Sequence, residues 1–539
     1  MLNRFSAYLL FVFGALAALS GCRTTQALSP GLVAQLKDTP QGYLSGEVTG
    51  IRQYALMNNR DFVYSVDISP GGEKAAFTHL GPKTFQLETW RLEGEPRQIS
   101  DKDLNHYQYD VESLDFSPDG KTIVTASRDG SVRFFAAEDG APLGVYATEE
   151  PLVSVAFHPS GHYVAAGSAK GLITLLSFPQ LQFAFEQRAH EGEVRNLVFS
   201  AEGVLYSGGW DKSIVSFDSS EEKVSTQEAR LRFERRGGLS VVKGMVSDTV
   251  PVAFAFDARV PFVVVTNEVA KKAGIDVPFL KETVQLATPM GSTLARVARG
   301  QSLTFKALRV KNVDLAICDA CVPGEALGVL GEAFTRRYEV AFDEVAGEAL
   351  LAAKEKSGEA PTQAVLTLKT KKRSSFDWYV NDFALDRTGR YLGVAFSEQK
   401  AERTREVYER EKKGVAEPSS EGNAGAIVDA QTGLIVRKWS VHQGVVATAA
   451  ISPDGQTLVT GGWDKRLLVY TPLETKPLEQ EFGWSVRRVR FSDDGRFLVV
   501  GAWTPQNPLG NQESNPSAVV YEVGYKMPQV QGGATALAR

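Results

Sequence analysis

The sequence predicts an all-β protein in which seven repeats of four strands close into a ring, with a second β domain inserted in the chain. A phrase recurs along the chain, most clearly as VATAAISPDGQTLVTGGWDKRLLVY at residues 446–470. It contains three apolar runs separated by Pro-Asp-Gly and by Asp-Lys, which are turn-forming combinations. Each copy therefore predicts three consecutive antiparallel strands.

The spacing of the copies predicts the ring. The apolar residue before the first turn recurs at intervals of 48, 41, 42, 186, 66 and 40 residues. Four intervals lie near the ~40–45 residues of a four-stranded propeller blade, and the other two equal one period plus an insertion. Seven copies fall within the range of about 4–8 blades that closes a propeller. The marked residues are Ile68, Phe116, Phe157, Phe199, Leu385, Ile451 and Phe491.

Three copies share a set of polar residues: a His before the first strand, a Ser or Thr in the second, an Asp in the next turn, and an aromatic residue six positions later. This set resembles the WD-repeat family, although the aromatic residue here is never Trp. The resemblance implies that each His and Asp is a structural residue of its blade, held by hydrogen bonds worth about 1 kcal/mol each. They are not expected to form catalytic dyads. The sets are His106, Thr125, Asp129 and Phe135; His190, Ser207, Asp211 and Phe217; and His442, Thr460, Asp464 and Tyr470.

The N-terminal residues predict export and lipid attachment. Arg4 precedes an apolar run of 13 residues at 7–19, which is too short to span a bilayer and suits the core of a signal peptide. The following Leu-Ser-Gly-Cys resembles the bacterial lipobox, which implies cleavage before Cys22 and lipidation of its thiol, for instance with palmitate. Arg23 follows in place of the Asp that marks inner-membrane retention, which favours the outer membrane.

Composition excludes several classes of function. The net charge is −5 with both signs well mixed, which argues against a nucleic-acid partner. Apart from Cys22 the chain has only Cys318 and Cys321, which fits an oxidising compartment without a disulfide framework. No Gly-rich loop opens a helix to hold phosphate, and no segment pairs Ser, His and Asp as an activated nucleophile. We therefore expect no cofactor.

The repeat pattern stops after Asp218 and resumes at Trp378, so residues 219–375 predict an inserted domain with a core at about 230–345. An apolar strand ends at Asp257, a Val-Leu-Gly turn stands at 329–331, and a short helix and a strand then end at Asp343. This order resembles the retropepsin-like aspartic protease domain, and the flap of that family would lie near 287–298. Residues 346–375 are expected to return to the ring through a short helix and basic coil.

The resemblance makes Asp257 the candidate catalytic residue. It also implies a homodimer through the inserted domain, because the family pairs one Asp from each of two chains, and the two share a proton to give one acid and one base. Here the triplet Asp-Thr-Gly is replaced by Asp257-Ala258-Arg259. Ala258 lacks the bracing hydroxyl, and the charge of Arg259 favours ionised Asp257. We therefore expect a non-catalytic domain used for dimerisation or peptide binding, with residual activity as the alternative.

Two further motifs predict no metal site. His158 and His162 have H-x₃-H spacing, but the Pro and Gly between them place the pair on a turn, not on a helix. Cys318 and Cys321 lack two further ligands nearby, and the Val-Pro-Gly that follows denies the helix of a thioredoxin-like motif. We expect a small loop disulfide between them, with free thiols as the alternative.

Together these features predict a lipid-anchored bacterial envelope protein that faces the periplasm and holds protein partners with its propeller loops. The alternatives are an aspartic endopeptidase that acts as a homodimer and, by fold-level analogy, an envelope-assembly factor. The expected domains are a signal peptide at 1–21, a tether at 22–43, blades one to four at 44–218, the inserted domain at 219–375, blades five to seven at 376–523 and a tail at 524–539.

Overall fold

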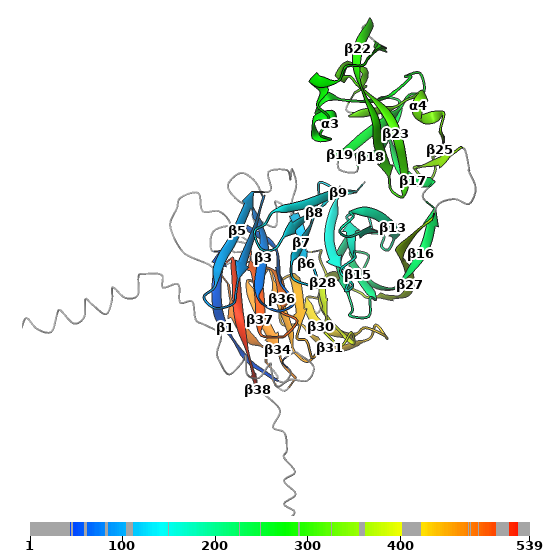
Figure 1. Cartoon of the computed structure of the whole chain (residues 1–539). Coiled ribbons are helices and arrows are strands. Elements are labelled where there is room, and N and C mark those ends of the chain that lie inside the picture. Colours follow the sequence, from blue (N-terminus) through cyan, green and yellow to red (C-terminus); the bar gives the residue numbers. More distant parts are fainter. Residues whose placement is uncertain are drawn as a thin grey trace, which may run out of the picture.

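Strands dominate the protein, and they form seven four-stranded sheets and one ten-stranded sheet (Figure 1). The seven sheets follow one another as the blades of a propeller, so the predicted fold class is confirmed. No helix in the described part of the chain is long and apolar enough to cross a membrane. The computed structural model describes residues 44, 47–58, 62–80, 85–103, 111–148, 150–225, 227–247, 250–288, 291–324, 326–354, 362–400, 422–472, 474, 476–482, 485–502 and 517–526.

Several predicted features lie outside the described residues. They are the signal peptide, Cys22, the tether up to residue 43, His106 and the tail from residue 527.

Five blades are built from four strands that are consecutive in the chain. Blade one contains β2 (Phe62–Ile68), β3 (Lys74–Leu80), β4 (Phe85–Arg91) and β5 (Arg97–Asp103); blade two contains β6 (Val111–Phe116), β7 (Thr122–Ser127), β8 (Ser131–Ala136) and β9 (Pro142–Ala147); blade three contains β10 (Leu152–Phe157), β11 (Tyr163–Ser168), β12 (Leu172–Ser177) and β13 (Gln182–Arg188); blade five contains β28 (Tyr379–Leu385), β29 (Tyr391–Ser397), β30 (Ala424–Asp429) and β31 (Ile435–Trp439); blade six contains β32 (Val446–Ile451), β33 (Leu458–Gly462), β34 (Arg466–Tyr470) and β35 (Leu478–Glu481).

The turn after the first strand explains why the repeated phrase is so regular. In blade six, Ser452 Oγ donates to Asp454 Oδ1 at 2.5 Å, and the same oxygen accepts the Gln456 N–H at 3.1 Å. Gly455 follows with φ +74°, a backbone conformation that residues with a side chain rarely adopt. Ser117 and Asp119 form the same bond at 2.6 Å in blade two. The Ser-Pro-Asp-Gly sequence therefore forms a turn whose polar groups are hydrogen-bonded to one another.

Blade seven closes the ring with strands from both ends of the chain. Its sheet order is β36 (Val486–Phe491), β37 (Phe497–Ala502), β38 (Ala518–Lys526) and then β1 (Glu47–Asn58), which pairs antiparallel with β38. The structure thus corrects two of the domain boundaries expected from the sequence. Residues 47–58 belong to blade seven and not to blades one to four, and the last strand continues past residue 523 to Lys526.

Blade four contains the insertion within its own sheet. Its order is β14 (Val194–Phe199), β15 (Leu205–Gly209), β16 (Ser213–Ser225) and β27 (Thr362–Ser375), so the chain leaves after the third strand and returns as the fourth. The insert therefore does not emerge between blades four and five. Residues 219–225 and 362–375, which the sequence suggested were part of the insert, extend blade four as a long two-stranded ribbon (Figure 1).

The inserted domain is a ten-stranded sheet with two short helices. The parallel pairs β19–β24 and β20–β23 lie at its centre. Residues 348–353, expected to be helical, form β26 between β17 and β25. The elements are β17 (Glu228–Arg236), β18 (Leu239–Val246), β19 (Val250–Phe256), β20 (Val263–Val265), α3 (Asn267–Lys272), η1 (Val277–Phe279), β21 (Thr283–Thr288), β22 (Gly291–Phe305), β23 (Leu308–Ile317), η2 (Asp319–Cys321), β24 (Gly328–Leu330), α4 (Glu332–Thr335), β25 (Tyr338–Asp343) and β26 (Glu348–Ala353).

The inserted domain also contacts the propeller beside the ribbon. Arg232 Nη1 lies 2.8 Å from Glu150 Oε1, and Lys306 Nζ lies 2.7 Å from Glu186 Oε1. Met245 packs with the buried apolar side chains between blades two and three. Glu150 is only 5% exposed, so at least one of these ion pairs is shielded from water. The domain is therefore held against the ring at more than one point.

The inner strands meet around a buried carboxylate. Asp382 on β28 accepts hydrogen bonds from Asn196 Nδ2 at 2.8 Å and from Thr448 Oγ1 at 2.6 Å. It also accepts from Arg488 Nη1 at 2.9 Å and Arg490 Nη1 at 3.0 Å, and its side chain is 0% exposed. Burial opposes ionisation, but the two guanidinium groups hold the pKa of Asp382 below its usual range. One carboxylate thus joins blades four, five, six and seven.

We predict that Asp382→Ala destabilises the protein by about 3–5 kcal/mol, because it leaves buried guanidinium groups without their counter-charge. Urea unfolding measures this loss. Asp218→Ala is the matched control, since Asp218 pairs with Lys371 where both side chains are 55% exposed; its loss should stay within about 1 kcal/mol. Equal losses in the two variants would contradict the role given to Asp382.

Candidate functional site

The candidate catalytic residue, Asp257, follows β19 at the centre of the inserted domain. Its backbone N–H donates to Leu330 O at 3.2 Å, and its own carbonyl accepts the Val260 N–H at 3.0 Å. The loop is therefore anchored to β24, the strand that runs parallel to β19. Asp257 is 16% exposed at its side chain. Asp257 thus lies in the loop between β19 and β20, beside β24.

Arg259 occupies both oxygens of that carboxylate. Its Nε donates to Asp257 Oδ1 and its Nη2 to Oδ2, each at 2.8 Å, and its backbone N–H donates to Oδ1 at 3.1 Å. The hydrogen bond from Arg259 lowers the pKa of Asp257 below its usual value, and the charge of Arg259 adds to the effect. In the described part of the chain, Asp257 is thus paired with an arginine that favours its ionised form.

The expected flap is a hairpin of β21 and β22. The two strands pair from Thr283 with Arg296 to Thr288 with Gly291. Two large apolar side chains in and just before this hairpin are open to solvent: Phe279 is 79% exposed and Leu294 is 71% exposed. The domain therefore has a strand hairpin and exposed apolar groups that could contact a peptide or another protein chain.

Cys318 and Cys321 form a disulfide in the structure, with their Cα atoms 5.4 Å apart. Between them, Asp319 accepts the Asn267 N–H at 2.7 Å and the Asn267 side-chain amide at 2.9 Å. Asn267 is the first residue of α3. The disulfide loop therefore joins the end of β23 to the start of α3.

The polar residues of the repeats form closed hydrogen-bond sets in two blades. His190 lies 2.9 Å from Asp211 through Nδ1 and 2.7 Å from Ser207 through Nε2. His442 repeats this pattern with Asp464 at 3.0 Å and Thr460 at 2.7 Å. Burial opposes it, but the hydrogen bond and charge of His190 lower the pKa of Asp211. Because both imidazole nitrogens are engaged inside the blade, these histidines are not positioned to act on a ligand.

In blade two, whose His106 lies outside the described residues, the turn repeats the bonds that Ser213 makes to Asp211 in blade four. Asp129 accepts hydrogen bonds from the Ser131 N–H at 2.7 Å and the Ser131 hydroxyl at 2.5 Å. Its carboxylate also lies 3.8 Å from Arg133. Asp129 therefore organises its own turn.

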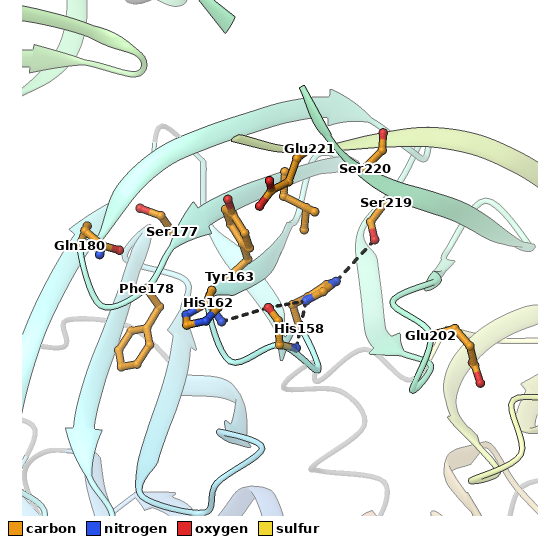
Figure 2. Close-up of a pocket in the computed structure, with 12 residues that line it drawn as sticks. His158, His162, Tyr163, Ser177, Phe178, Gln180, Glu202, Ser219, Ser220 and Glu221 are labelled. Carbon is orange, nitrogen blue, oxygen red and sulfur yellow. Dashed lines mark hydrogen bonds between the residues drawn. The ribbon is translucent and has the colours of Figure 1, made fainter. Parts of the chain in front are cut away.

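His158 and His162 lie on a turn beside a cavity of about 560 Å³ between blades three and four (Figure 2). The Ser160 N–H donates to His158 Nδ1 at 3.1 Å, so the proton of a neutral ring is on Nε2, 3.5 Å from Ser219 Oγ. Burial and the neighbouring His162 lower the pKa of His158. The His158 ring is thus oriented by its own turn and by the ribbon of blade four. The other lining residues are Tyr163, Ser177, Phe178, Gln180, Glu202, Ser220, Glu221 and Leu366.

Sequence reasoning missed a carboxylate pair in the ring. Asp67 on β2 and Asp115 on β6 are hydrogen-bonded to each other and lie near Arg490. Asp67 accepts the Phe116 N–H at 3.0 Å and Asp115 the Phe157 N–H at 2.6 Å, so each carboxyl reaches the next blade. Burial raises the pKa of Asp67 to about 6, and burial with the charge of Asp67 raises the pKa of Asp115 well above its usual range. Both residues stand immediately before the marked apolar residue of their repeat, a coincidence that comparing the repeats could have shown.

Two family descriptions match the chain. "WD domain, G-beta repeat" matches residues 101–135, 140–175 and 433–471, and "Aspartyl protease" matches residues 242–334. The protein is thus a seven-bladed propeller of WD40 repeats that carries an aspartyl protease-like domain of the retropepsin type. WD40 propellers generally mediate protein–protein interactions.

The curated relatives match only part of the chain. The guanine nucleotide-binding protein subunit beta of Oryza sativa subsp. indica is 34% identical over 121 residues, covering 20% of this chain and 32% of the rice protein. That of Arabidopsis thaliana is 32% identical over 163 residues, covering 28% and 42%. The chain therefore spans less than half of these relatives. The solved structure of U3-55K covers 89% of this chain and 100% of its own, with a TM-score of 0.47 and 9% identity.

We predict that the carboxylate pair makes stability depend on pH. In the folded protein, the pKa values of Asp67 and Asp115 lie above the value of about 3.9 expected in the unfolded chain. The folded state therefore holds these protons more tightly, and the pair stabilises the fold at low pH. That contribution is lost as the pH rises through about 6. Asp115→Asn keeps an acceptor for the Phe157 N–H and a donor for Asp67 but does not titrate. Between pH 5 and 8, urea unfolding should show a smaller loss of stability in this variant than in the unmodified protein; parallel pH profiles would contradict the shared proton.

Proposed function

We propose that this protein is a lipid-anchored scaffold of a bacterial envelope, facing the periplasm, whose propeller holds protein partners. The aspartyl protease-like domain then serves as a binding module and not as a working peptidase. The observation that carries the second statement is the two-point contact of Arg259 with Asp257. An aspartic peptidase needs one protonated and one ionised carboxyl, and an arginine pair favours the ionised form alone.

The propeller supports the scaffold role by its rigidity. Asp382 joins four blades, and the inserted domain is held to the ring by the ribbon and by the ion pairs of Glu150 and Glu186. A partner that contacts both the ring and the inserted domain would meet two surfaces in a fixed relation. The envelope location is supported by the sequence alone, through Arg4, the apolar run at 7–19 and the Leu-Ser-Gly-Cys motif.

The alternative is an aspartic endopeptidase, and one observation favours it. The structure contains the elements that the family uses: the strand before Asp257, the flap hairpin, β24 and α4. Activity would require a second copy of the chain, because one copy supplies one such Asp. Attachment of two copies to one membrane would favour that pairing by raising their effective concentration.

We predict no Asp257-dependent peptide cleavage by the unmodified protein. Residues 23–539 are incubated with a denatured protein substrate between pH 4 and 7, beside Asp257→Asn as the blank. The double variant Ala258→Thr, Arg259→Gly removes the guanidinium and restores the hydroxyl, so any gain of activity should appear there first. Robust cleavage by the unmodified protein that Asp257→Asn abolishes would replace the scaffold function with the peptidase.

A separate prediction tests the anchor. Cys22→Ser removes the thiol that would be lipidated, so the variant should remain unprocessed or appear in the soluble fraction of the bacterial envelope. Membrane fractionation and labelling with a fatty-acid analogue measure this outcome, with Cys318→Ser as the control for loss of a cysteine that lies outside the Leu-Ser-Gly-Cys motif. A Cys22→Ser variant that stays attached and processed like the unmodified protein would rule out the lipobox.

A further inference from the structure

Three side chains of metal-binding type meet on one face of blade one. His79 lies on β3, Glu88 on β4 and Asp101 on β5. Glu88 pairs with Phe77 across β3–β4 and with Asp101 across β4–β5, and His79 is two residues from Phe77. Since alternate residues of a strand share a face, all three side chains point to the same side of the sheet. One nitrogen and two carboxylate oxygens lie within 4.8 Å of one another.

The separation of the two buried groups fits two ligands of one ion. His79 Nε2 lies 3.6 Å from Glu88 Oε2. Tetrahedral ligands at about 2.0–2.2 Å from zinc are about 3.4 Å apart, so little movement is needed to admit an ion. His79 is 3% exposed and Glu88 is 7% exposed, whereas Asp101 is exposed. Asp101 therefore has the freedom to close on an ion that arrives from solvent.

A neighbouring residue orients the glutamate. Trp90 Nε1 donates to Glu88 Oε1 at 2.5 Å, and the other oxygen, Oε2, is the one nearest to His79. The ring of Phe77 lies against that of His79, with the centroids 5.4 Å apart. Hydrogen bonds and packing that fix a ligand side chain are a regular feature of metal sites, because they reduce the ordering that binding requires.

Comparison of the blades shows that His79 has an unusual position. His79 pairs with Val63 at the register point where Val194 pairs with Gly209 in blade four and Val446 pairs with Gly462 in blade six. A Cβ on Gly209 would stand 2.4 Å from Nδ1 of His190, so glycine is what leaves room for the histidine of the repeat. In blade one His79 takes the place of this glycine, and its imidazole lies on the same face of the sheet as the carboxylates of Glu88 and Asp101.

We propose that His79, Glu88 and Asp101 bind one divalent ion of the zinc class. One imidazole and two carboxylates suit zinc and neighbouring transition metals, and their two negative charges balance the ion. The fourth position is open to water or to a ligand atom of a partner protein. The sequence motifs predict no metal site, because a spacing of nine and thirteen residues follows no known ligand motif and only the register of three strands brings the groups together.

The test measures metal binding by the full chain from residue 23, after removal of metal with a chelator. Zn²⁺ is titrated in competition with a chromophoric chelator, and Co²⁺ is added separately to record its visible absorption. We expect one equivalent of Zn²⁺, with affinity at least tenfold weaker in Asp101→Asn and in Glu88→Gln. Zn²⁺ should also raise the unfolding temperature of the unmodified protein more than that of either variant.

Two controls keep the test specific. Asp139→Asn changes an exposed turn carboxylate in the neighbouring blade, and His162→Ala changes the histidine turn beside the cavity; both should bind like the unmodified protein. Asp101 is exposed, so its variant is expected to fold, and circular dichroism checks this. The proposal is overturned if the unmodified protein binds no stoichiometric Zn²⁺, if Asp101→Asn and Glu88→Gln bind unchanged, or if only His162→Ala loses binding.

Discussion

The carboxylate of Asp382 accepts hydrogen bonds from three other blades, and the propeller depends on keeping that buried charge paired. Asn196 reaches it from the residues before the inserted domain, and Arg488 and Arg490 reach it from blade seven. Trp210 adds a second bond across the insertion, from its Nε1 to Asn381 at 3.2 Å. A ring interrupted by a whole domain thus stays continuous because polar side chains of blade four bond directly to the inner strand of blade five.

Carboxylates in this protein illustrate how surroundings decide chemistry. Asp382 is surrounded by donors and stays ionised, whereas Asp67 and Asp115 face each other and retain a proton to higher pH. Asp257 stands in the loop where a protease-like domain would use a shared proton, yet its partner is a guanidinium. The carboxylate pair with raised pKa values and the protease-like loop therefore belong to different domains.

The inner strands could be predicted from the sequence because their residues are buried and recur with the repeat. Outer strands give no such signal: β35 is exposed along its length, and β1 and β27 lie far in sequence from the sheets they complete. The Ala-, Leu- and Glu-rich residues of β26 favour a helix by propensity, but pairing with β17 and β25 prevails. The loop after the strand that ends at Asp257, and the effect of Arg259 on the ionisation of Asp257, could be predicted from the sequence. The cluster of His79, Glu88 and Asp101 could not, because only the register of three strands brings these residues together.

Two of the seven blades cannot be completed until late in synthesis. In blade four, β16 can pair with β27 only after the whole inserted domain has been synthesised. In blade seven, β1 pairs with β38, which lies more than 400 residues later in the chain. Such long sequence separations slow folding, because the chain loses the entropy of closing a large loop before the contact forms. A nascent or truncated chain would therefore expose unpaired strand edges at two places, in blade four until β27 has been made and in blade seven until β38 has been made.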